Sequence, residues 1–185
     1  DENNNWISPD ELISKDGKKY LKNDKSKQVK IGPSESMSKS KRNTIDPENI
    51  INNYGADSVR LFILSDSPPE KDVQWSEDGI IASFKFIQKL WSLNEKVLGE
   101  INKNHTKDNS HELTKFTNRF VKKISNNLEN FSYNIIIANL HEMHSYLTKE
   151  VIKGYQKKTI LENYKKILIT MMPILPHLSN ECFES

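Results

Sequence analysis

The sequence predicts a mostly α-helical protein, in which a helical bundle follows a small segment of mixed α/β structure. Apolar residues recur at steps of three and four through most of residues 76–185, the spacing of amphipathic helices. Polar clusters and prolines divide this stretch into runs of bundle length. Residues 1–33 instead hold short alternating runs and a turn sequence, as strands do. We therefore divide the chain into residues 1–33, 34–75 and 76–185.

The first part of the chain predicts a small helix and short strands. A Ser-Pro pair at residues 8–9 suits the N-cap and first position of a helix. The turn sequence at residues 16–17 separates this helix from a short run at residues 18–21, and residues 29–31 alternate like a strand. Residues 22–28 are rich in lysine, and a disordered linker is the alternative there.

The middle part begins with a polar loop and continues into two short helices. Asp46 suits a helix N-cap, Pro47 the first helical position, and Gly55 the left-handed residue that ends the helix. A second helix then runs to about Ser65. Its expected apolar face consists of Val59, Phe62 and Ile63.

Four long helices are predicted from residue 76 onward, with Ser76 as the N-cap of the first. Their apolar positions are Phe84, Ile87, Leu90, Trp91, Val97 and Leu98; Leu113, Phe116, Phe120, Ile124, Leu128 and Phe131; Ile136, Leu140, Met143, Leu147 and Val151; and Ile160, Tyr164, Ile167, Leu168, Met171 and Leu175. Loops are expected at residues 102–110, around Ser132 and at residues 153–158. Pro173 and Pro176 end the fourth helix, and four such helices can enclose their own core.

The composition is that of a soluble protein. The 185 residues include 27 Lys and Arg against 25 Asp and Glu, for a net charge of +2. No apolar run is long enough to cross a bilayer, and no signal segment opens the chain. Cys182 is the only cysteine, so an intrachain disulfide is excluded. We expect a cytoplasmic protein without a membrane partner.

The polar loop at residues 35–43 has the residue types that bind a polyphosphate. Its hydroxyl residues are Ser36, Ser38 and Ser40, its cations are Lys39, Lys41 and Arg42, and Met37 stands between them. Hydroxyl and backbone N–H groups donate to phosphate oxygens, lysine brings a mobile charge, and the methionine can anchor the loop on apolar surface. A solvated surface turn has a similar composition, so the neighbouring sequence decides between the two.

With its neighbours, the loop resembles the KMSKS motif of class I aminoacyl-tRNA synthetases, and in particular that of the leucyl-tRNA synthetases. The matching residues are Met37-Ser38-Lys39-Ser40-Lys41, Asn43, Asp46-Pro47, Tyr54-Gly55-Ala56-Asp57, Arg60-Leu61-Phe62, Ser67-Pro68-Pro69-Glu70-Lys71-Asp72 and Trp75. The isoleucyl and valyl enzymes are the close competitors, and their loop usually continues with Leu-Gly-Asn. Ser36 departs from the pattern, because the motif has its first lysine there.

The resemblance implies a ligase that activates leucine with ATP and Mg²⁺ and transfers it to tRNA(Leu). It implies that Lys39 is catalytic, stabilising the charge that builds on pyrophosphate. The implied ATP-binding residues are Ser36, Met37, Ser38, Lys39 and Ser40, with Lys41 and Arg42 as auxiliary phosphate contacts. The longer protein is expected to be a monomer.

The resemblance also implies roles for the other parts of the chain. Residues 1–33 would join an inserted domain to the catalytic loop, residues 34–75 would end the catalytic domain, and residues 76–185 would be the anticodon-binding domain. Candidates for tRNA phosphate contacts are Lys115, Lys122, Lys123, Lys149, Lys153, Lys157 and Lys158. For each of them a plain solvated surface lysine is the more common interpretation, because acidic residues nearly balance the basic ones along the chain. His141 and His144 lack neighbouring ligands, so no zinc or other metal site is expected.

A class I synthetase also needs a His-Ile-Gly-His-type motif, and this sequence has none. We therefore expect a piece of a longer enzyme that is inactive alone. Two alternatives stay open: a subunit of a split synthetase that pairs with a second chain, and a non-catalytic module that binds tRNA or another RNA.

Overall fold

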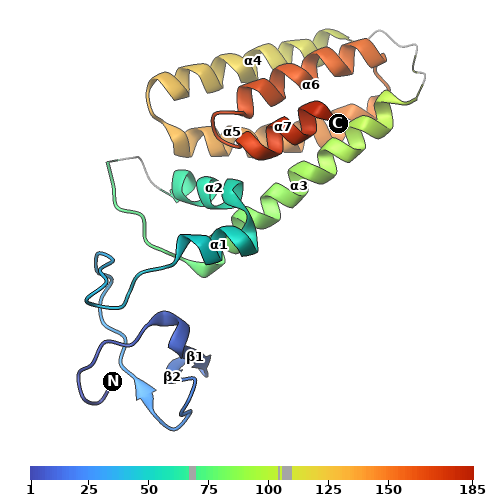
Figure 1. The fold of residues 1–185 in the computed structure, drawn as a ribbon. Coiled ribbons are helices and arrows are strands. Elements are labelled where there is room, and N and C mark those ends of the chain that lie inside the picture. The colour runs from blue at the N-terminus through green and yellow to red at the C-terminus, as the bar shows by residue number, and fades with distance from the viewer. Residues whose placement is uncertain (67–69, 104, 106–109) are drawn as a thin grey trace. The chain divides into compact units, whose positions relative to one another are not determined.

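The computed structural model describes residues 1–66, 70–103, 105 and 110–185 (Figure 1). It consists of two compact units, Asp1–Ile50 and Ile51–Ser185. The described residues form mostly α-helix with one small sheet, as the sequence predicts. The division at residues 33 and 75 stays a prediction.

The first unit contains a three-stranded antiparallel sheet in the order β1-β2-β3. The strands are β1 (Leu12–Lys15), β2 (Lys18–Leu21) and β3 (Gln28–Val29). Asp16 and Gly17 connect the first two strands with φ angles of 49° and 74°. This left-handed pair makes the two-residue turn of a hairpin, so Lys15 lies opposite Lys18.

The helix expected after Ser8 is much shorter than predicted. It is a single 3-10 turn, Pro9–Glu11, in which the Glu11 carboxylate accepts a hydrogen bond from the Ser8 N–H at 3.1 Å. The following residues belong to β1, because the hairpin turn pairs them with β2. Ser8 is the N-cap, as the sequence predicts, but the helix that it starts is only one turn long.

The lysine-rich stretch before β3 forms a turn in place of the disordered linker that the sequence allows. The Lys27 N–H donates to the Asp24 carbonyl at 3.0 Å, and the Leu21 N–H donates to the Lys27 carbonyl at 3.2 Å. The third strand is Gln28–Val29, whereas the sequence predicts it at residues 29–31.

The short helices begin and end largely as predicted. They are α1 (Pro47–Tyr54) and α2 (Ala56–Asp66). The Asp46 carboxylate accepts from the Glu48 N–H at 3.0 Å, and Gly55 has a φ of 80°. The turn predicted at Pro68-Pro69 lies outside the described residues, as does most of the loop predicted at residues 102–110.

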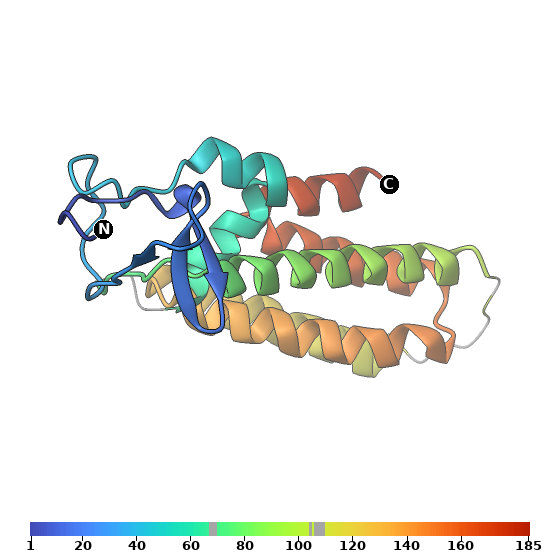
Figure 2. The same cartoon turned by 90° about the horizontal axis from the view of Figure 1, so that it is seen from below.

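The second unit is a helical bundle with a continuous apolar core. Its long helices are α3 (Glu77–Ile101), α4 (Ser110–Glu129), α5 (Tyr133–Glu150) and α6 (Lys157–Met171), followed by α7 (Pro176–Glu184). The 3-10 turn η2 (Val151–Lys153) joins α5 to α6. As Figures 1 and 2 show, α4 packs against α5 and α6, while α3 lies along α5. Ser76 caps α3 as predicted, accepting from the Gly79 N–H at 3.1 Å.

Three residues predicted on apolar faces are exposed instead. Ile63, Trp91 and Phe131 keep 49%, 38% and 61% of their surface in solvent. On α2 the buried apolar residues are Leu61 and Phe62, because this helix packs against both α3 and α5. Periodicity shows that a helix has an apolar face, but the neighbouring helices decide how the helix is rotated.

The predicted end of the fourth long helix is wrong. α6 ends at Met171, two residues before Pro173, but Pro176 starts a further helix. Proline fits the first helical position, because the N–H it lacks has no partner there. The sequence reading took both prolines as terminators.

Gly154 gives the first testable prediction. Its φ is +81°, and an added Cβ would lie 2.9 Å from Nδ1 of His105. Gly154→Ala is expected to lower the free energy of unfolding by about 1–2 kcal/mol, because alanine is strained in this conformation. Urea denaturation of the 185-residue chain measures it. Gly99→Ala is the matched control, since Gly99 is helical with open space around it; equal effects of the two changes would contradict the prediction.

Glu100 gives a second prediction, on pH. Its buried carboxylate accepts from Lys103 Nζ at 2.7 Å and contacts His105 Nε2 at 3.1 Å. The Lys103 hydrogen bond lowers the pKa of Glu100 below its ordinary 4.5, against the opposing effect of burial and with further help from His105. A lowered folded-state pKa stabilises the protein above the unfolded-state value, and this stability is lost as the pH falls through the folded-state pKa.

We therefore expect the Glu100→Gln variant to lose less stability than the unchanged chain as the pH is lowered below about 4.5. Urea denaturation at a series of pH values measures the difference. Glu95→Gln, at an exposed position of the same helix, is the control. Parallel pH profiles for the Glu100 variant and the unchanged chain would refute the assignment.

Candidate functional site

The KMSKS-like loop, residues 35–43, folds as two overlapping turns. The Lys41 N–H donates to the Ser38 carbonyl and the Arg42 N–H to the Lys39 carbonyl, both at 3.2 Å. Arg42 has a φ of 49°, in the left-handed region that reverses the chain. The loop therefore has a defined backbone, although most of its side chains are exposed.

Asn43 holds this loop from its end. Its Oδ1 accepts from the Ser38 N–H at 2.7 Å, and its Nδ2 donates to the Ser36 carbonyl at 3.3 Å. The hydroxyls of Ser38 and Ser40 lie 2.7 Å apart. The sequence reading included Asn43 in the motif but gave it no role, since only the folded loop shows that its amide closes the turn.

The three cations of the loop have different surroundings. Lys41 forms an ion pair with Glu35 and lies 6.0 Å from the centre of the Trp6 ring. Arg42 lies 3.2 Å from the Glu11 carboxylate. Lys39 is exposed, and its ammonium has no hydrogen bond or ion pair within the part of the chain that the structure describes.

The loop can therefore bind and stabilise negative charge. Lys39 stands between Ser38 and Ser40 in the chain, and its ammonium has no partner among the described residues; ammonium and hydroxyl groups are suited to phosphate oxygens. Met37 is 50% exposed, so the apolar anchoring expected of it is not made within this unit. Contact of these residues with ATP stays a prediction.

The residues that follow the loop in the motif have a structural role in the bundle unit. The buried Asp57 carboxylate accepts from the Leu178 N–H at 2.7 Å and contacts His177 Nδ1 at 2.9 Å. Arg60 donates to the carbonyls of Pro173 and Ile174 at 2.8 and 3.1 Å. Two charged residues of α2 thus bind both sides of the corner between α6 and α7.

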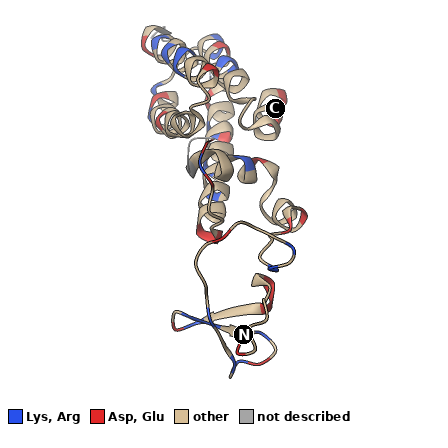
Figure 3. Ribbon diagram, turned by 90° about the vertical axis from the view of Figure 1, so that its left-hand side faces the viewer, with Lys and Arg blue, Asp and Glu red and all other residues tan. Residues whose placement is uncertain are grey.

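The predicted tRNA-contacting lysines are spread over several elements of the bundle. Lys115, Lys122 and Lys123 lie on α4, Lys149 on α5, Lys153 on η2, and Lys157 and Lys158 on α6. Figure 3 shows basic and acidic residues interspersed along these helices. Lys123 pairs with Glu142 at 2.9 Å, Lys153 with Glu150 at 2.8 Å and Lys158 with Glu162 at 3.9 Å. Their contact with tRNA stays a prediction.

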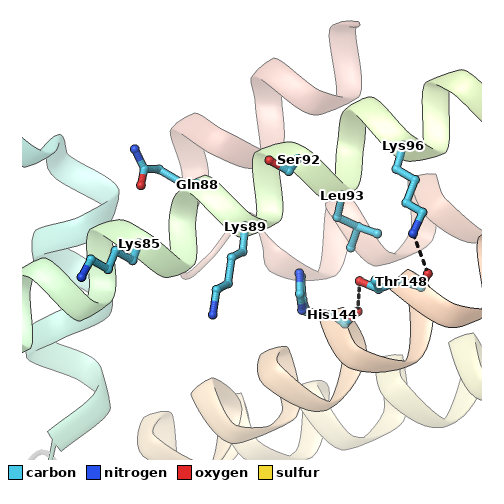
Figure 4. A pocket seen from close by; sticks show the side chains of 8 residues that line it. All are labelled: Lys85, Gln88, Lys89, Ser92, Leu93, Lys96, His144 and Thr148. Atoms are coloured by element: carbon cyan, nitrogen blue, oxygen red, sulfur yellow. Dashed lines mark hydrogen bonds between the residues drawn. The ribbon is translucent and has the colours of Figure 1, made fainter.

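The sequence reading missed a groove between α3 and α5, which we call the lysine groove (Figure 4). Its volume is about 510 Å³, and its lining residues are Lys85, Gln88, Lys89, Ser92, Leu93, Lys96, His144 and Thr148. The lysines of α3 follow one another at steps of four and seven, a helical spacing that the sequence already contained.

His144, which lines this groove, and His141 both contact the aromatic ring of Phe86. The His141 ring stacks on Phe86 with centroids 3.7 Å apart, and His144 meets the same ring edge-on at 5.9 Å. Among the residues that the structure describes, no three His, Cys, Asp or Glu side chains are grouped to hold a metal ion. None of the described helices has the length and apolar character that crossing a membrane requires.

Two family descriptions match the chain. "tRNA synthetases class I (I, L, M and V)" matches residues 30–76, which include the KMSKS-like loop, and "Anticodon-binding domain of tRNA ligase" matches residues 110–185. The two matches fall on the parts of the chain where the loop and most of the bundle lie.

Curated relatives named leucine–tRNA ligase align with nearly the whole chain. The Bartonella henselae protein is 38% identical over 96% of the chain, and the Rickettsia massiliae protein is 35% identical over 100% of it. In both cases the chain spans 22% of the relative's length.

A solved structure shares the fold. It is the LeuRS of Agrobacterium radiobacter K84 in a ternary complex with tRNA and LeuAMS, which matches 80% of the chain and 20% of its own with a TM-score of 0.70 and 20% identity. The mostly helical fold class is therefore confirmed. By its sequence matches along both units, this chain is similar to the leucine–tRNA ligases over nearly its whole length and to two tRNA synthetase family descriptions over residues 30–76 and 110–185.

Proposed function

We propose that the longer protein containing this chain is a leucine–tRNA ligase. It activates leucine with ATP, releasing pyrophosphate, and transfers the leucyl group from AMP to tRNA(Leu). The observation that carries the proposal is the exposed Lys39, which has no ion pair among the residues that the structure describes, in a KMSKS-like loop whose other two cations are paired with carboxylates. The relatives named leucine–tRNA ligase support the amino-acid specificity.

In this function Lys39 stabilises the transition state of leucine activation. As the leucine carboxylate attacks the α-phosphate, negative charge builds on the departing pyrophosphate, and a positioned ammonium lowers the energy of that charge. The Ser38 and Ser40 hydroxyls donate to neighbouring phosphate oxygens. Mg²⁺ accompanies ATP on those oxygens, its usual mode of binding.

Ser36 removes one cation from this loop, and Lys41 is the residue best placed to replace it. Its ion pair with Glu35 is partly exposed, and such pairs contribute only about 0–1 kcal/mol. A phosphate can therefore exchange with Glu35 at little cost. On this proposal Lys41 supplies the positive charge that serine at position 36 lacks.

The bundle docks tRNA through its phosphates, and the predicted lysines on α4, α5, η2 and α6 are candidates for that contact. Those without an acidic partner among the described residues are Lys115, Lys122, Lys149 and Lys157. They are better candidates than the paired lysines, because an ion pair must be broken before a paired lysine binds phosphate. We also propose that the protein acts as a monomer in the cytoplasm.

Leucine-dependent ATP–pyrophosphate exchange by the full-length protein tests the proposal, with isoleucine and valine in parallel. Exchange with leucine alone is the expected result. Exchange with isoleucine or valine would mean that the protein is specific for that amino acid in place of leucine. No exchange by folded protein would favour the RNA-binding module, or the split subunit if adding a second chain restored the reaction.

A further inference from the structure

The lysine groove has the charge of an anion-binding surface. None of its eight lining residues is acidic. Lys85 and Lys89 have no ion pair within the described residues, unlike Lys123 and Lys153 elsewhere in the bundle. Two positive charges without a carboxylate partner in the described part of the chain thus line one groove of the surface.

Hydrogen bonds fix two further side chains that line the groove, Lys96 and Thr148. Lys96 Nζ donates to the Thr148 carbonyl at 3.0 Å, and the Thr148 hydroxyl donates to the His144 carbonyl at 2.7 Å. In Figure 4, Lys89 and His144 project toward the same space between the two helices. The groove therefore has an ordered wall on α5 and a row of cations on α3.

Burial and the positive charge of the groove both lower the pKa values of His141 and His144. Burial and the nearby Lys89 lower the pKa of His144, and burial, His144 and Lys89 lower the pKa of His141. An anion in the groove would oppose the effect of Lys89. On α5, Glu142 is paired with Lys123 of α4 at 2.9 Å.

The dimensions of the groove favour an extended ligand. Lys85 and Lys96 are eleven residues apart, which is about 16 Å along a helix. That distance is much longer than a single phosphate group and suits a run of phosphates along a strand. The adjacent aromatic ring, Phe86, is 4% exposed and covered by His141, so it offers no platform for base stacking.

We propose that the lysine groove between α3 and α5 binds the sugar-phosphate backbone of tRNA. Lys85 and Lys89 contact the phosphates directly, and Lys96 sets one end of the groove. The contact adds affinity without reading bases, as phosphate contacts do. This inference rests on the proposed function, because it assumes that tRNA is the RNA bound.

The test measures binding of a tRNA(Leu) transcript to the full-length protein over a range of salt concentrations. Removing both charges in Lys85→Gln/Lys89→Gln is expected to raise the Kd about tenfold or more. It is also expected to make the plot of the logarithm of the association constant against the logarithm of the salt concentration less steep, by about 1–2 in slope. The matched control is Lys165→Gln/Lys166→Gln, which removes the same charge from exposed positions of α6. Thermal unfolding of each variant checks that the fold is retained.

The outcomes separate the inference from the proposed function. An effect on Kd and slope that the control lacks supports the groove. Equal affinities and slopes for the groove variant and the control would overturn it, and so would weaker binding with an unchanged salt slope. Leucine-dependent exchange by the unaltered protein reports on the proposed function independently, because leucine activation precedes transfer to tRNA.

Discussion

Replacing Lys39 by alanine is expected to slow leucine activation by the full-length protein at least about a hundredfold, roughly 2.7 kcal/mol of transition-state stabilisation. The reason is that its ammonium, which no described residue pairs with, can contact the charge on the departing pyrophosphate. With alanine, the negative charge that develops on pyrophosphate loses its contact with the ammonium, and water stabilises this charge less well than a positioned cation does. ATP–pyrophosphate exchange at saturating leucine measures the change, with kcat and KM for ATP determined separately.

The matched control is Arg42→Ala in the same loop. Arg42 lies 3.2 Å from the Glu11 carboxylate, so it is already partly neutralised, and its removal is expected to slow activation far less than loss of Lys39. A Lys39 variant with unchanged exchange, or equal losses for both variants, would show that the motif does not work through Lys39. An effect on KM alone would assign Lys39 to ATP binding without transition-state stabilisation.

Replacing Asp57 by alanine is expected to lower the free energy of unfolding by about 2–4 kcal/mol. The carboxylate is buried and accepts from the Leu178 N–H at 2.7 Å in the first turn of α7, beside the His177 ring at 2.9 Å. Alanine removes this cap and leaves a buried N–H without its partner. The carboxylate also holds α2 against the start of α7, so packing at this corner is weakened as well.

Urea denaturation of the 185-residue chain measures the effect. Asp78→Ala is the matched control, since Asp78 lies in the first turn of α3 and is exposed. Asp57→Asn keeps an acceptor oxygen and is expected to lose less than alanine does. A cost for Asp57→Ala no greater than that of the control would mean that the corner between α6 and α7 is held by packing alone.

The candidate loop could be picked out from the sequence because its signals are local. Small hydroxyl residues beside Lys39 and the Asp46-Pro47 start of α1 are covalent neighbours, and the backbone turns of the loop involve residues only three apart. The contacts of Asn43 and the ion pairs of Lys41 and Arg42 could be identified only in the folded loop. The Arg42 pair joins residues 31 positions apart in sequence, which no local pattern specifies.

The sequence by itself determined that the chain is mostly helical, where most helices begin, and that Ser76 and Gly55 lie at helix boundaries, because caps and periodicity are set by residues within a few positions of one another. Only the tertiary structure decided which face of α2 is buried, that Pro176 begins a helix, and that α3 and α5 together form the lysine groove. Those features depend on contacts between segments up to about 120 residues apart, as in the bond from Leu178 to Asp57. Helical periodicity specifies that a face is apolar, and packing against the other helices then selects the rotation and the partners.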